Sequence, residues 1–219
     1  MRVLVACEES QRVCTAFREK GHEAYSCDIQ ECSGGHPEWH IQGDVLPILN
    51  GKCQFVTMDG KTHSIPDRWD LIIAHPPCTY MSNAGACRLY PKAGFIDAKR
   101  LEKALDAKDF FMEFYNADCE KICIENPMPM KIIRLPIESQ RIHPYQFGEP
   151  FSKKTYLWLK GLPLLKYTDI CAEYKPFLPS GTGRKLRGDS YGAKECAHES
   201  KARSKTFLGI AKAMAEQWG

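Results

Sequence analysis

The sequence predicts one α/β domain built on a doubly wound, mainly parallel sheet. Short apolar runs alternate with helical stretches, and polar residues collect where those runs end. The chain has 219 residues, of which 43% are apolar, so it is long enough for one such core and too short for two large ones. Ligands of these sheets bind beyond the carboxyl ends of the strands, so functional residues are expected there.

The N-terminal elements follow from the local pattern. Residues 2–6 form a short apolar run, which is typical of a buried parallel strand. A helix is predicted over residues 11–20, because Val13, Cys14 and Phe17 share one face and a glycine follows in the usual C-terminal cap position. Further strands are expected at residues 23–27, which run into Asp28, and in a short segment closed by the Gly-Asp pair at 43–44.

A hairpin and two buried strands come next. Within residues 53–64, an Asp-Gly pair at 59–60 separates two β-prone runs, which indicates a hairpin inserted outside the central sheet. Residues 69–74 and 121–124 are predicted as buried strands, with a long helix over residues 97–117 between them.

The second half has a different pattern. Residues 142–147 and 154–159 are predicted as strands joined by a turn at 148–150, and they are expected to form an antiparallel edge pair. Residues 176–203 are rich in Gly, Lys, Arg and Ser and are expected to form a long loop. Residues 206–218 are predicted as an amphipathic helix.

Composition narrows the class of function. The formal net charge is +3, so contact with nucleic acid would come from a local patch. No apolar run has the length of a membrane span or the pattern of a signal peptide, so a cytoplasmic protein is expected. The eleven cysteines include no Cys-x-x-Cys pair, and the nearest approach to a metal cluster is Cys171, Cys196 and His198. We therefore expect reduced thiols and no metal.

Cys78 is the candidate nucleophile. It directly follows Pro76-Pro77, which in turn follow a predicted buried strand, so its thiol is presented from a stiff loop. In a chain with eleven cysteines, the alternative is that Cys78 is inert filler of the core. The polar, glycine-containing segment that follows it favours the exposed loop.

Glu125 is the candidate acid. It ends the predicted strand at 121–124, where partial burial raises the pKa of a carboxyl group and suits proton donation. From this segment alone, a cap for the following turn is equally compatible with the sequence.

Three segments together resemble the cytosine-C5 DNA methyltransferases. Residues 74–85 (Ala-His-Pro-Pro-Cys-Thr-Tyr-Met-Ser-Asn-Ala-Gly) are similar to that family's Gly-Pro-Pro-Cys loop, and residues 124–127 (Ile-Glu-Asn-Pro) to its Glu-Asn-Val segment. Residues 147–161 resemble its Tyr-Gly-Val-Pro-Gln-x-Arg-x-Arg strand. They occur in the family's order, which makes the set more specific than each motif alone. The resemblance covers about residues 1–161 and implies a Rossmann-like, S-adenosylmethionine-dependent methyltransferase sheet.

The resemblance implies a compact enzyme of phage or prophage type that methylates C5 of cytosine in DNA. The Cys78 thiolate would attack C6 of the base, and Glu125 would hold the base through N3 and the exocyclic amine. Lys153 or Lys154 would replace an arginine that supports the base, although a solvated basic turn is equally compatible. Ser82 is implied as a further catalytic residue. The base must leave the helical stack or already be single-stranded.

The resemblance also implies a set of residues that bind S-adenosylmethionine. Asp28 would accept the ribose hydroxyls, with a helix cap as its alternative role, and Asp44 the adenine amine, with a turn as its alternative. The first loop departs from the family, because no glycine stands between residues 7 and 11, so the methionine end must be held differently. The full implied set is Cys7, Glu8, Glu9, Ser10, Asp28, Ile29, Asp44 and Pro76.

The region that would recognise nucleic acid is short. The predicted organisation is a catalytic region at 1–161, a reduced recognition region at 162–203 and a helix at 204–219 that packs back on the first. The middle region mixes aromatic residues with basic ones, which suits phosphate contact and base stacking, although a solvated loop is the alternative. Sequence-specific readout by so short a segment would be limited unless the chain forms a homodimer. The implied nucleic-acid-binding residues are Lys154, Arg184, Lys185 and Arg187.

Two other functions fit the same residues. One is an enzyme that modifies single-stranded DNA, RNA or a nucleotide, or that transfers a different group. The other is a catalytically silent nucleic-acid-binding homologue, against which the presence of both Cys78 and Glu125 counts.

Overall fold

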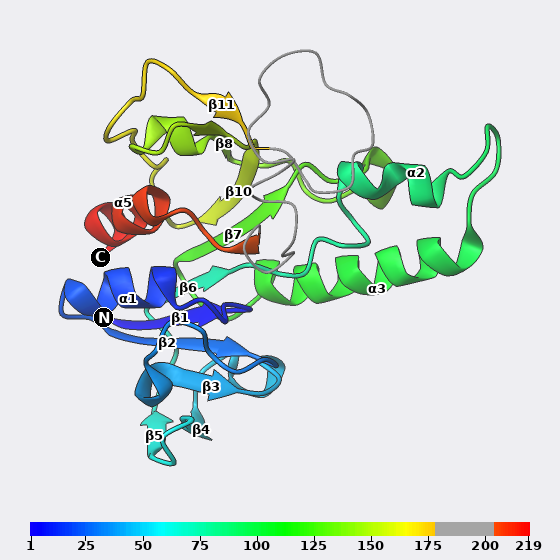
Figure 1. Ribbon diagram of the computed structural model, residues 1–219. Coiled ribbons are helices and arrows are strands. Elements are labelled where there is room, and N and C mark those ends of the chain that lie inside the picture. The colour runs from blue at the N-terminus through cyan, green and yellow to red at the C-terminus, as the bar shows by residue number, and fades with distance from the viewer. Residues whose placement is uncertain (178–203) are drawn as a thin grey trace.

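The structure is a computed structural model that describes residues 1–177 and 204–219. It has three layers, with a central seven-stranded sheet and helices on both faces (Figure 1). The strand order is β3-β2-β1-β6-β7-β10-β8, which confirms the predicted doubly wound α/β class. The strands of this sheet are β1 (Arg2–Ala6), β2 (Glu23–Asp28), β3 (His40–Gln42), β6 (Leu71–Ala74), β7 (Ile122–Pro127), β8 (Gln140–Ile142) and β10 (Thr155–Lys160).

The strand directions place a ligand crevice beside β1. Strands β3, β2, β1, β6 and β7 are parallel to one another, whereas β10 is antiparallel to both β7 and β8. β1 pairs with β2 on one side and with β6 on the other, so the chain first builds outward and then returns to the far side of β1. The strand order therefore reverses between β1 and β6. In such sheets ligands bind beyond the carboxyl ends of the strands at that point.

Each face of the sheet is covered by a different set of helices. α1 (Arg12–Glu19) and α5 (Leu208–Trp218) lie side by side on one face, as Figure 1 shows. Their buried side chains pack on Val3, Val5 and Leu71. α3 (Ala98–Tyr115) packs on the other face, which carries the alternate residues of the same strands. The period of two along each strand thus supplies both cores.

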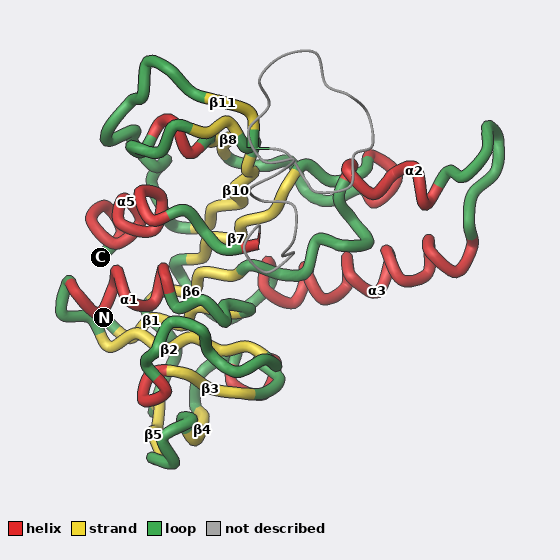
Figure 2. The backbone as a smooth tube through the Cα atoms, in the orientation of Figure 1, coloured by secondary structure: helices red, strands yellow, loops and turns green. Residues whose placement is uncertain are grey.

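The insertion is a hairpin, as predicted. β4 (Cys53–Val56) and β5 (Thr62–Ile65) form a two-stranded antiparallel sheet of their own, and Figure 2 shows it beyond β3 at one end of the molecule. Gly60 in the turn has a positive φ of 84°, a conformation that favours glycine.

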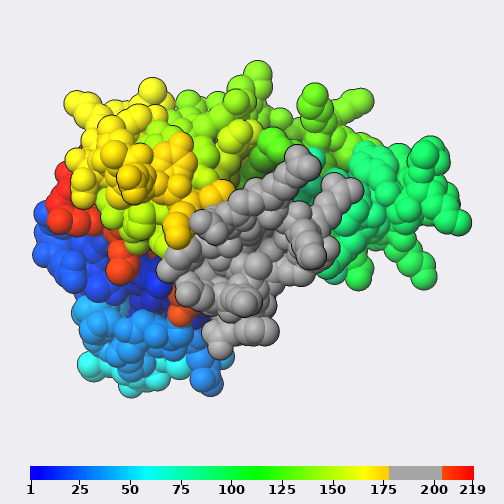
Figure 3. Space-filling model, turned by 45° about the horizontal axis from the view of Figure 1, so that its top comes forward, coloured from blue at the N-terminus to red at the C-terminus, as the bar shows by residue number. Residues whose placement is uncertain are grey.

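The remaining elements are short. Figure 3 shows that the segment from α2 (Ala86–Leu89) to the start of α3 stands out from the body of the molecule. No helix in residues 1–177 or 204–219 has the length and apolar character needed to cross a membrane. The other elements are β9 (Phe151–Ser152), β11 (Lys175–Pro176) and the 3-10 turns at Pro37–Trp39, Leu46–Ile48, Asn83–Gly85, Lys131–Ile133 and Pro144–Gln146.

Two predicted strand ends were wrong by three or more residues. β7 continues to Pro127 instead of ending at residue 124, because β10 pairs along its whole length, with Leu157 opposite Glu125. The strand predicted at 142–147 is instead β8, which ends at Ile142, followed by a 3-10 turn. Pro144 lacks the N–H that a strand would use, and its fixed φ suits the first position of that turn. The predicted antiparallel edge pair itself is confirmed as β8 and β10.

Candidate functional site

Three loops meet where β1, β6 and β7 end. The pairing of β6 with β1 extends into the loop after β6, because the His75 N–H donates to the Ala6 carbonyl at 2.9 Å. The buried Asn126 side chain donates to the Pro76 carbonyl at 2.8 Å and so ties the proline loop to β7. These bonds hold the proline loop rigidly against both neighbouring strands.

Cys78 lies at the turn of that loop and is partly exposed. Its carbonyl accepts the N–H groups of Met81 at 3.1 Å and Ser82 at 2.9 Å, which closes a tight turn. Ser82 is only 8% exposed and forms a bridge with Pro129. Cys78 is therefore not filler of the core, and Ser82 belongs to the scaffold that fixes its loop.

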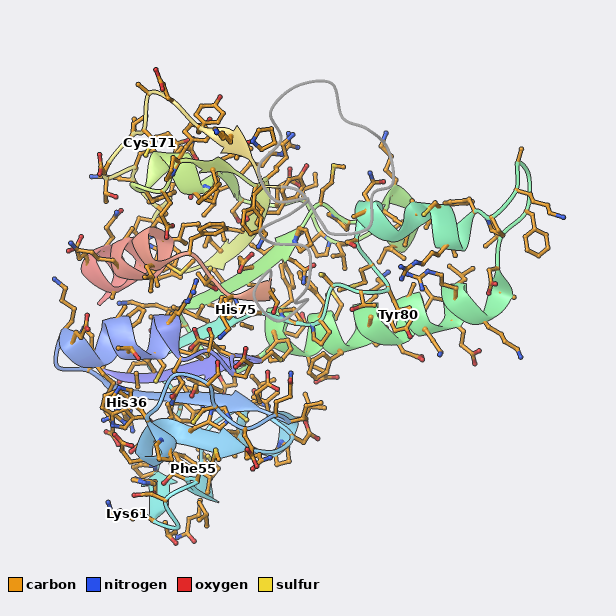
Figure 4. All side chains as sticks on the ribbon, viewed as in Figure 1. His36, Phe55, Lys61, His75, Tyr80 and Cys171 are labelled. Carbon is orange, nitrogen blue, oxygen red and sulfur yellow. The ribbon has the colours of Figure 1, made fainter. Side chains whose placement is uncertain are left out.

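Glu125 has a partner that the sequence reasoning did not assign, His75. The register pairs Ala74 with Ile124, so the next residues, His75 and Glu125, are neighbours on the same face of the sheet. His75 Nδ1 lies 2.9 Å from Glu125 Oε2, and the two side chains are 11% and 12% exposed. Figure 4 places His75 at the centre of the molecule, beside the ends of β6 and β7.

Each member of the His75–Glu125 pair shifts the pKa of the other toward its charged form. The prediction that partial burial raises the pKa of Glu125 was wrong. Burial alone would raise it, but the hydrogen bond from His75 and the positive charges of His75 and Lys153 outweigh burial and lower that pKa. Burial would likewise lower the pKa of His75, yet its bond to Glu125 and the charges of Glu125 and Glu8 raise it. The structure therefore favours an ionised carboxylate beside a protonated imidazole.

The two lysines before β10 act on different groups. Lys153 lowers the pKa of Glu125 through its charge, and its Nζ lies 5.6 Å from the centre of the Phe207 ring. Lys154 is exposed, and after the larger effect of burial its charge lowers the pKa of His143. Successive residues of an extended chain point to opposite sides, so Lys153 alone serves the acid.

A pocket of about 180 Å³ opens beside β1 and β2. Four of the implied cofactor residues line it, namely Cys7, Asp28, Ile29 and Asp44. The other lining residues are Cys27, Gln30, Gly43, Val45, Pro77 and Phe110, none of which the sequence reasoning assigned. It is Pro77 that reaches this pocket, whereas the buried Pro76 uses its carbonyl to bind Asn126.

The two acids of this pocket are held by local turns. Asp28 accepts the N–H of Gln30 at 2.9 Å, and Asp44 accepts that of Leu46 at 3.1 Å, each through Oδ1. Burial, and then the charges of Asp28, Cys27 and Asp44, raise the pKa of Cys7. That thiol is therefore a neutral wall of the pocket, and the carboxylates are its polar groups.

The loop after β1 contains no glycine, and two of its residues, Cys7 and Glu8, explain how it forms a turn and starts α1 without one. Cys7 has a positive φ of 59°, the conformation that a glycine adopts more easily. Glu8 accepts the N–H groups of Val13 at 2.7 Å and Cys14 at 3.1 Å, and so satisfies the start of α1. Both oxygens of the buried Glu8 carboxylate are thus bonded to the start of α1, and its implied role toward the cofactor stays a prediction.

Glu9 is the residue of this loop that fits a ligand. Among the described residues, both of its carboxylate oxygens are buried without a hydrogen-bond partner, and the Lys205 Nζ lies 3.9 Å from Oε1. A buried carboxylate in this state is matched by an ammonium group such as that of a methionine end. Ser10 lies instead in a separate groove of about 550 Å³ between α1 and α5.

Several implied residues lie outside the described residues. These are Arg184, Lys185 and Arg187. Cys196 and His198, which with Cys171 are the nearest approach to a metal cluster and are not expected to bind metal, lie there too.

Comparisons with known proteins add little to this geometry. No family model and no curated protein matches the chain. A crystal structure of a DNMT2 mutant from Spodoptera frugiperda is similar, with 16% sequence identity and a TM-score of 0.38. The match covers 81% of this chain and 55% of that one, so this chain spans about half the length of the solved structure. The fold class rests on the strand order itself.

Proposed function

We propose that this chain is an S-adenosylmethionine-dependent methyltransferase that acts on C5 of cytosine in DNA. The observation that supports it is one rigid edge of a doubly wound sheet. There the partly exposed Cys78 follows β6, the ionised Glu125 stands in the adjacent β7, and a pocket with two carboxylates opens beside β1. A nucleophile, a base-binding acid and a nucleoside pocket are what this reaction requires.

The cofactor would be held by the residues of the first loop and the pocket. Asp28 and Asp44 would accept hydrogen bonds from hydroxyl and amine groups through their second oxygens, since Oδ1 of each already accepts a backbone N–H. Ile29 is 77% exposed and offers an apolar surface to a planar ring. Glu9 would bind the ammonium group of the methionine end. When bound, S-adenosylmethionine supplies an electrophilic methyl group.

The chain's own residues would then prepare the base. The Cys78 thiolate would add to C6 and make C5 nucleophilic. After C5 has taken the methyl group, a base from the solvent would remove the C5 proton, and the electrons of that C–H bond would expel Cys78 from C6 as the thiolate. Glu125 faces the edge of the base that carries N3 and the exocyclic amine, with Lys153 beside it. The target base would come from a single strand or be flipped out of a duplex, because Cys78 and Glu125 cannot both contact a base that is stacked inside the helix.

The test is transfer of a labelled methyl group to nucleic acid, with Cys78→Ser against Cys87→Ser. Cys87 is an exposed cysteine on α2 and serves as the matched control. We expect Cys78→Ser to lose transfer by at least about a thousandfold and Cys87→Ser to behave as the unchanged protein. Mass spectrometry of the labelled polymer identifies the base and the mass added.

A trapping experiment reports the covalent step separately. DNA that contains 5-fluorocytosine should form an adduct with Cys78, because fluorine cannot leave as the C5 proton does. Adducts or label on RNA alone would move the substrate to RNA. DNA binding that survives Cys78→Ser, without transfer or adduct on any polymer, would contradict the enzyme and favour a silent binding protein.

A further inference from the structure

Lys205 is a partly buried cation that none of the roles proposed above uses. Its side chain is 23% exposed and comes from the segment just before α5. Its Nζ donates to Ser33 Oγ at 2.8 Å and lies 3.9 Å from Glu9 Oε1. The Ser33 N–H in turn donates to the Glu9 carbonyl at 2.8 Å. The loop after β1, the loop after β2 and the segment before α5 therefore meet around one carboxylate.

The segment that carries Lys205 is fixed by bonds to its neighbours. The next residue, Thr206, is buried, and its carbonyl accepts Nη1 of Arg12 from α1 at 2.8 Å. The Leu208 N–H donates to Glu149 Oε1 at 3.1 Å. The fold therefore places the ammonium group of Lys205 beside Glu9 without relying on the attraction between the two side chains.

The contact between Lys205 and Glu9 leaves both groups with hydrogen-bonding capacity. The Glu9 side chain is 8% exposed, and neither of its carboxylate oxygens has a hydrogen-bond partner within residues 1–177 and 204–219. At 3.9 Å, Lys205 opposes the charge of Glu9 but is beyond the range of about 2.7–3.2 Å of a hydrogen bond. An ammonium group also has more N–H donors than the contact with Ser33 uses. A buried carboxylate without hydrogen bonds is costly, so this site fits a ligand.

This site lies next to the pocket proposed for the nucleoside. Cys7 lines that pocket, and Glu9 follows it by two residues. Burial lowers the pKa of His40, whereas a hydrogen bond with the Gln30 carbonyl and the charges of Asp28 and Glu9 act in the opposite direction. The pocket carboxylate of Asp28 and the carboxylate of Glu9 therefore both lie near one histidine. A ligand held in the pocket can extend to Glu9 and Lys205.

A carboxylate beside an ammonium group matches a ligand end that carries the same two charges in the opposite order. An α-amino acid has this arrangement, because its ammonium and carboxylate groups share one carbon. Its ammonium group would face Glu9 and its carboxylate would face Lys205, so that unlike charges are neighbours throughout. A simple amine would leave Lys205 without an anion, and Glu9 would repel a simple anion.

We infer that Lys205, together with Ser33, binds the carboxylate of the same amino-acid end whose ammonium group Glu9 binds, so that the site selects a ligand with an intact α-amino acid. This inference rests on the proposed function for the identity of the ligand, S-adenosylmethionine. It is tested by binding, without any transfer.

The first experiment needs no variant. Calorimetry compares binding of S-adenosylmethionine with binding of its decarboxylated form, which keeps the adenosine, the sulfonium and the amine. The decarboxylated form has the greater positive charge, so a site made of Glu9, Asp28 and Asp44 alone would prefer it. We expect the unchanged chain to bind S-adenosylmethionine at least about tenfold more tightly, because only that compound engages Lys205. Equal binding, or a preference for the decarboxylated form, would overturn the inference.

The second experiment assigns each charge of the ligand to one residue. Lys205→Met keeps the apolar stem and removes the charge, so it should weaken S-adenosylmethionine at least about tenfold without weakening the decarboxylated form. Glu9→Gln should weaken both compounds, because both carry the amine. Lys205→Arg should keep most of the preference, since it keeps the charge. The control is Lys212→Met on α5, whose side chain is 73% exposed and which should change neither affinity.

The outcomes separate this inference from the proposed function. A folded Lys205→Met chain that weakens both compounds equally, or neither, would show that Lys205 only opposes the charge of Glu9, and the inference would fall. The expected binding pattern without transfer to any polymer would overturn the proposed function alone. Binding of neither compound by the folded, unchanged chain would overturn both. If Lys205→Met does not fold, the comparison of the two compounds on the unchanged chain still decides.

Discussion

Two histidine–glutamate pairs in the described residues have similar geometry and different surroundings. His36 Nδ1 lies 3.1 Å from Glu38 Oε1 on the surface, where both side chains are nearly 40% exposed. His75 Nδ1 lies 2.9 Å from Glu125 Oε2, where both are about a tenth exposed. The surface pair joins residues two apart in the chain, and the buried pair joins residues fifty apart.

The difference is one of solvent. Water and salt screen the surface pair, so its attraction is worth little. The buried pair has lost most of its hydration, so the charge of each side chain is compensated mainly by its partner, and removing one leaves the other as an uncompensated buried charge. The same two residue types therefore form a weak, screened contact at the surface and a strong, mutually dependent ion pair in the interior.

The largest effect is expected from Glu125→Ala. It removes the carboxylate that balances the buried imidazole and leaves a space beside it, so we expect unfolding to cost about 3 kcal/mol less than in the unchanged chain. Denaturant unfolding measures this, and Glu38→Ala is the matched control, with a change below about 1 kcal/mol. Equal losses in the two variants would refute the contrast.

The pH dependence of stability is the next largest effect. The folded pKa of His75 is raised, so its contribution is present below the ordinary histidine value of about 6.5 and is lost as pH rises through the folded value. The folded pKa of Glu125 is lowered, so its contribution is present above about 4.3 and is lost as pH falls through the folded value.

The stability difference between the unchanged chain and the double variant His75→Asn/Glu125→Gln should therefore be greatest between about pH 4.3 and 6.5. Glu8 and Lys153 are present in both proteins, so their own contributions largely cancel. Urea unfolding at several pH values checks this window. A difference that stays constant from pH 4 to pH 9 would show that the pair is not ionised.

A smaller effect is expected on the cofactor side. Asp28→Asn keeps the turn, because the amide oxygen can still accept the Gln30 N–H, but it removes a carboxylate from the pocket. We expect binding of S-adenosylmethionine to weaken about tenfold, with unfolding changed by less than about 0.5 kcal/mol. Calorimetry measures the binding, with the surface variant Asp106→Asn as control. Unchanged affinity would remove Asp28 from the proposed cofactor site.

The smallest effect is expected from His36→Asn. The pKa of Glu38 is lowered first by a hydrogen bond from its own backbone and only then by His36, so the largest single effect that favours its charged form remains. The loss of stability should be below about 0.5 kcal/mol and should shrink further in 1 M salt. A loss that is large and insensitive to salt would mean that exposure does not separate the two pairs.

Much of the fold was predictable because short stretches of sequence, through their hydrophobic periodicity and turn residues, indicate their own secondary structure. The apolar runs at β1 and β6, the helical face of α1 and the Asp-Gly turn of the hairpin each signal their structure within a few residues. Boundaries failed where a partner strand decided them, as at β7, which continues because β10 pairs along it. Local pattern contains no information about that partner.

The candidate site was predictable to the same extent. The proline loop placed Cys78 in a rigid, partly exposed turn, and the acids at the ends of β2 and β3 were predicted to serve one pocket, which both line. His75 received no role, although a polar residue directly before Pro-Pro at the end of a buried strand was a signal that could have found it. The sequence also could not distinguish Lys153 from Lys154.

The sequence by itself determined the alternation of strands and helices, the stiffness of the loop that carries Cys78 and the chemical groups at the strand ends, because each depends on neighbours in the chain. Only the tertiary structure decided that His75 meets Glu125 and that Lys153 acts on the same acid. It also decided that Glu8 caps α1, while the buried carboxylate of Glu9 has no hydrogen-bond partner among the described residues and only the Lys205 ammonium nearby. These outcomes depend on strand register and on burial, which bring together groups far apart in sequence and decide how strongly their charges act.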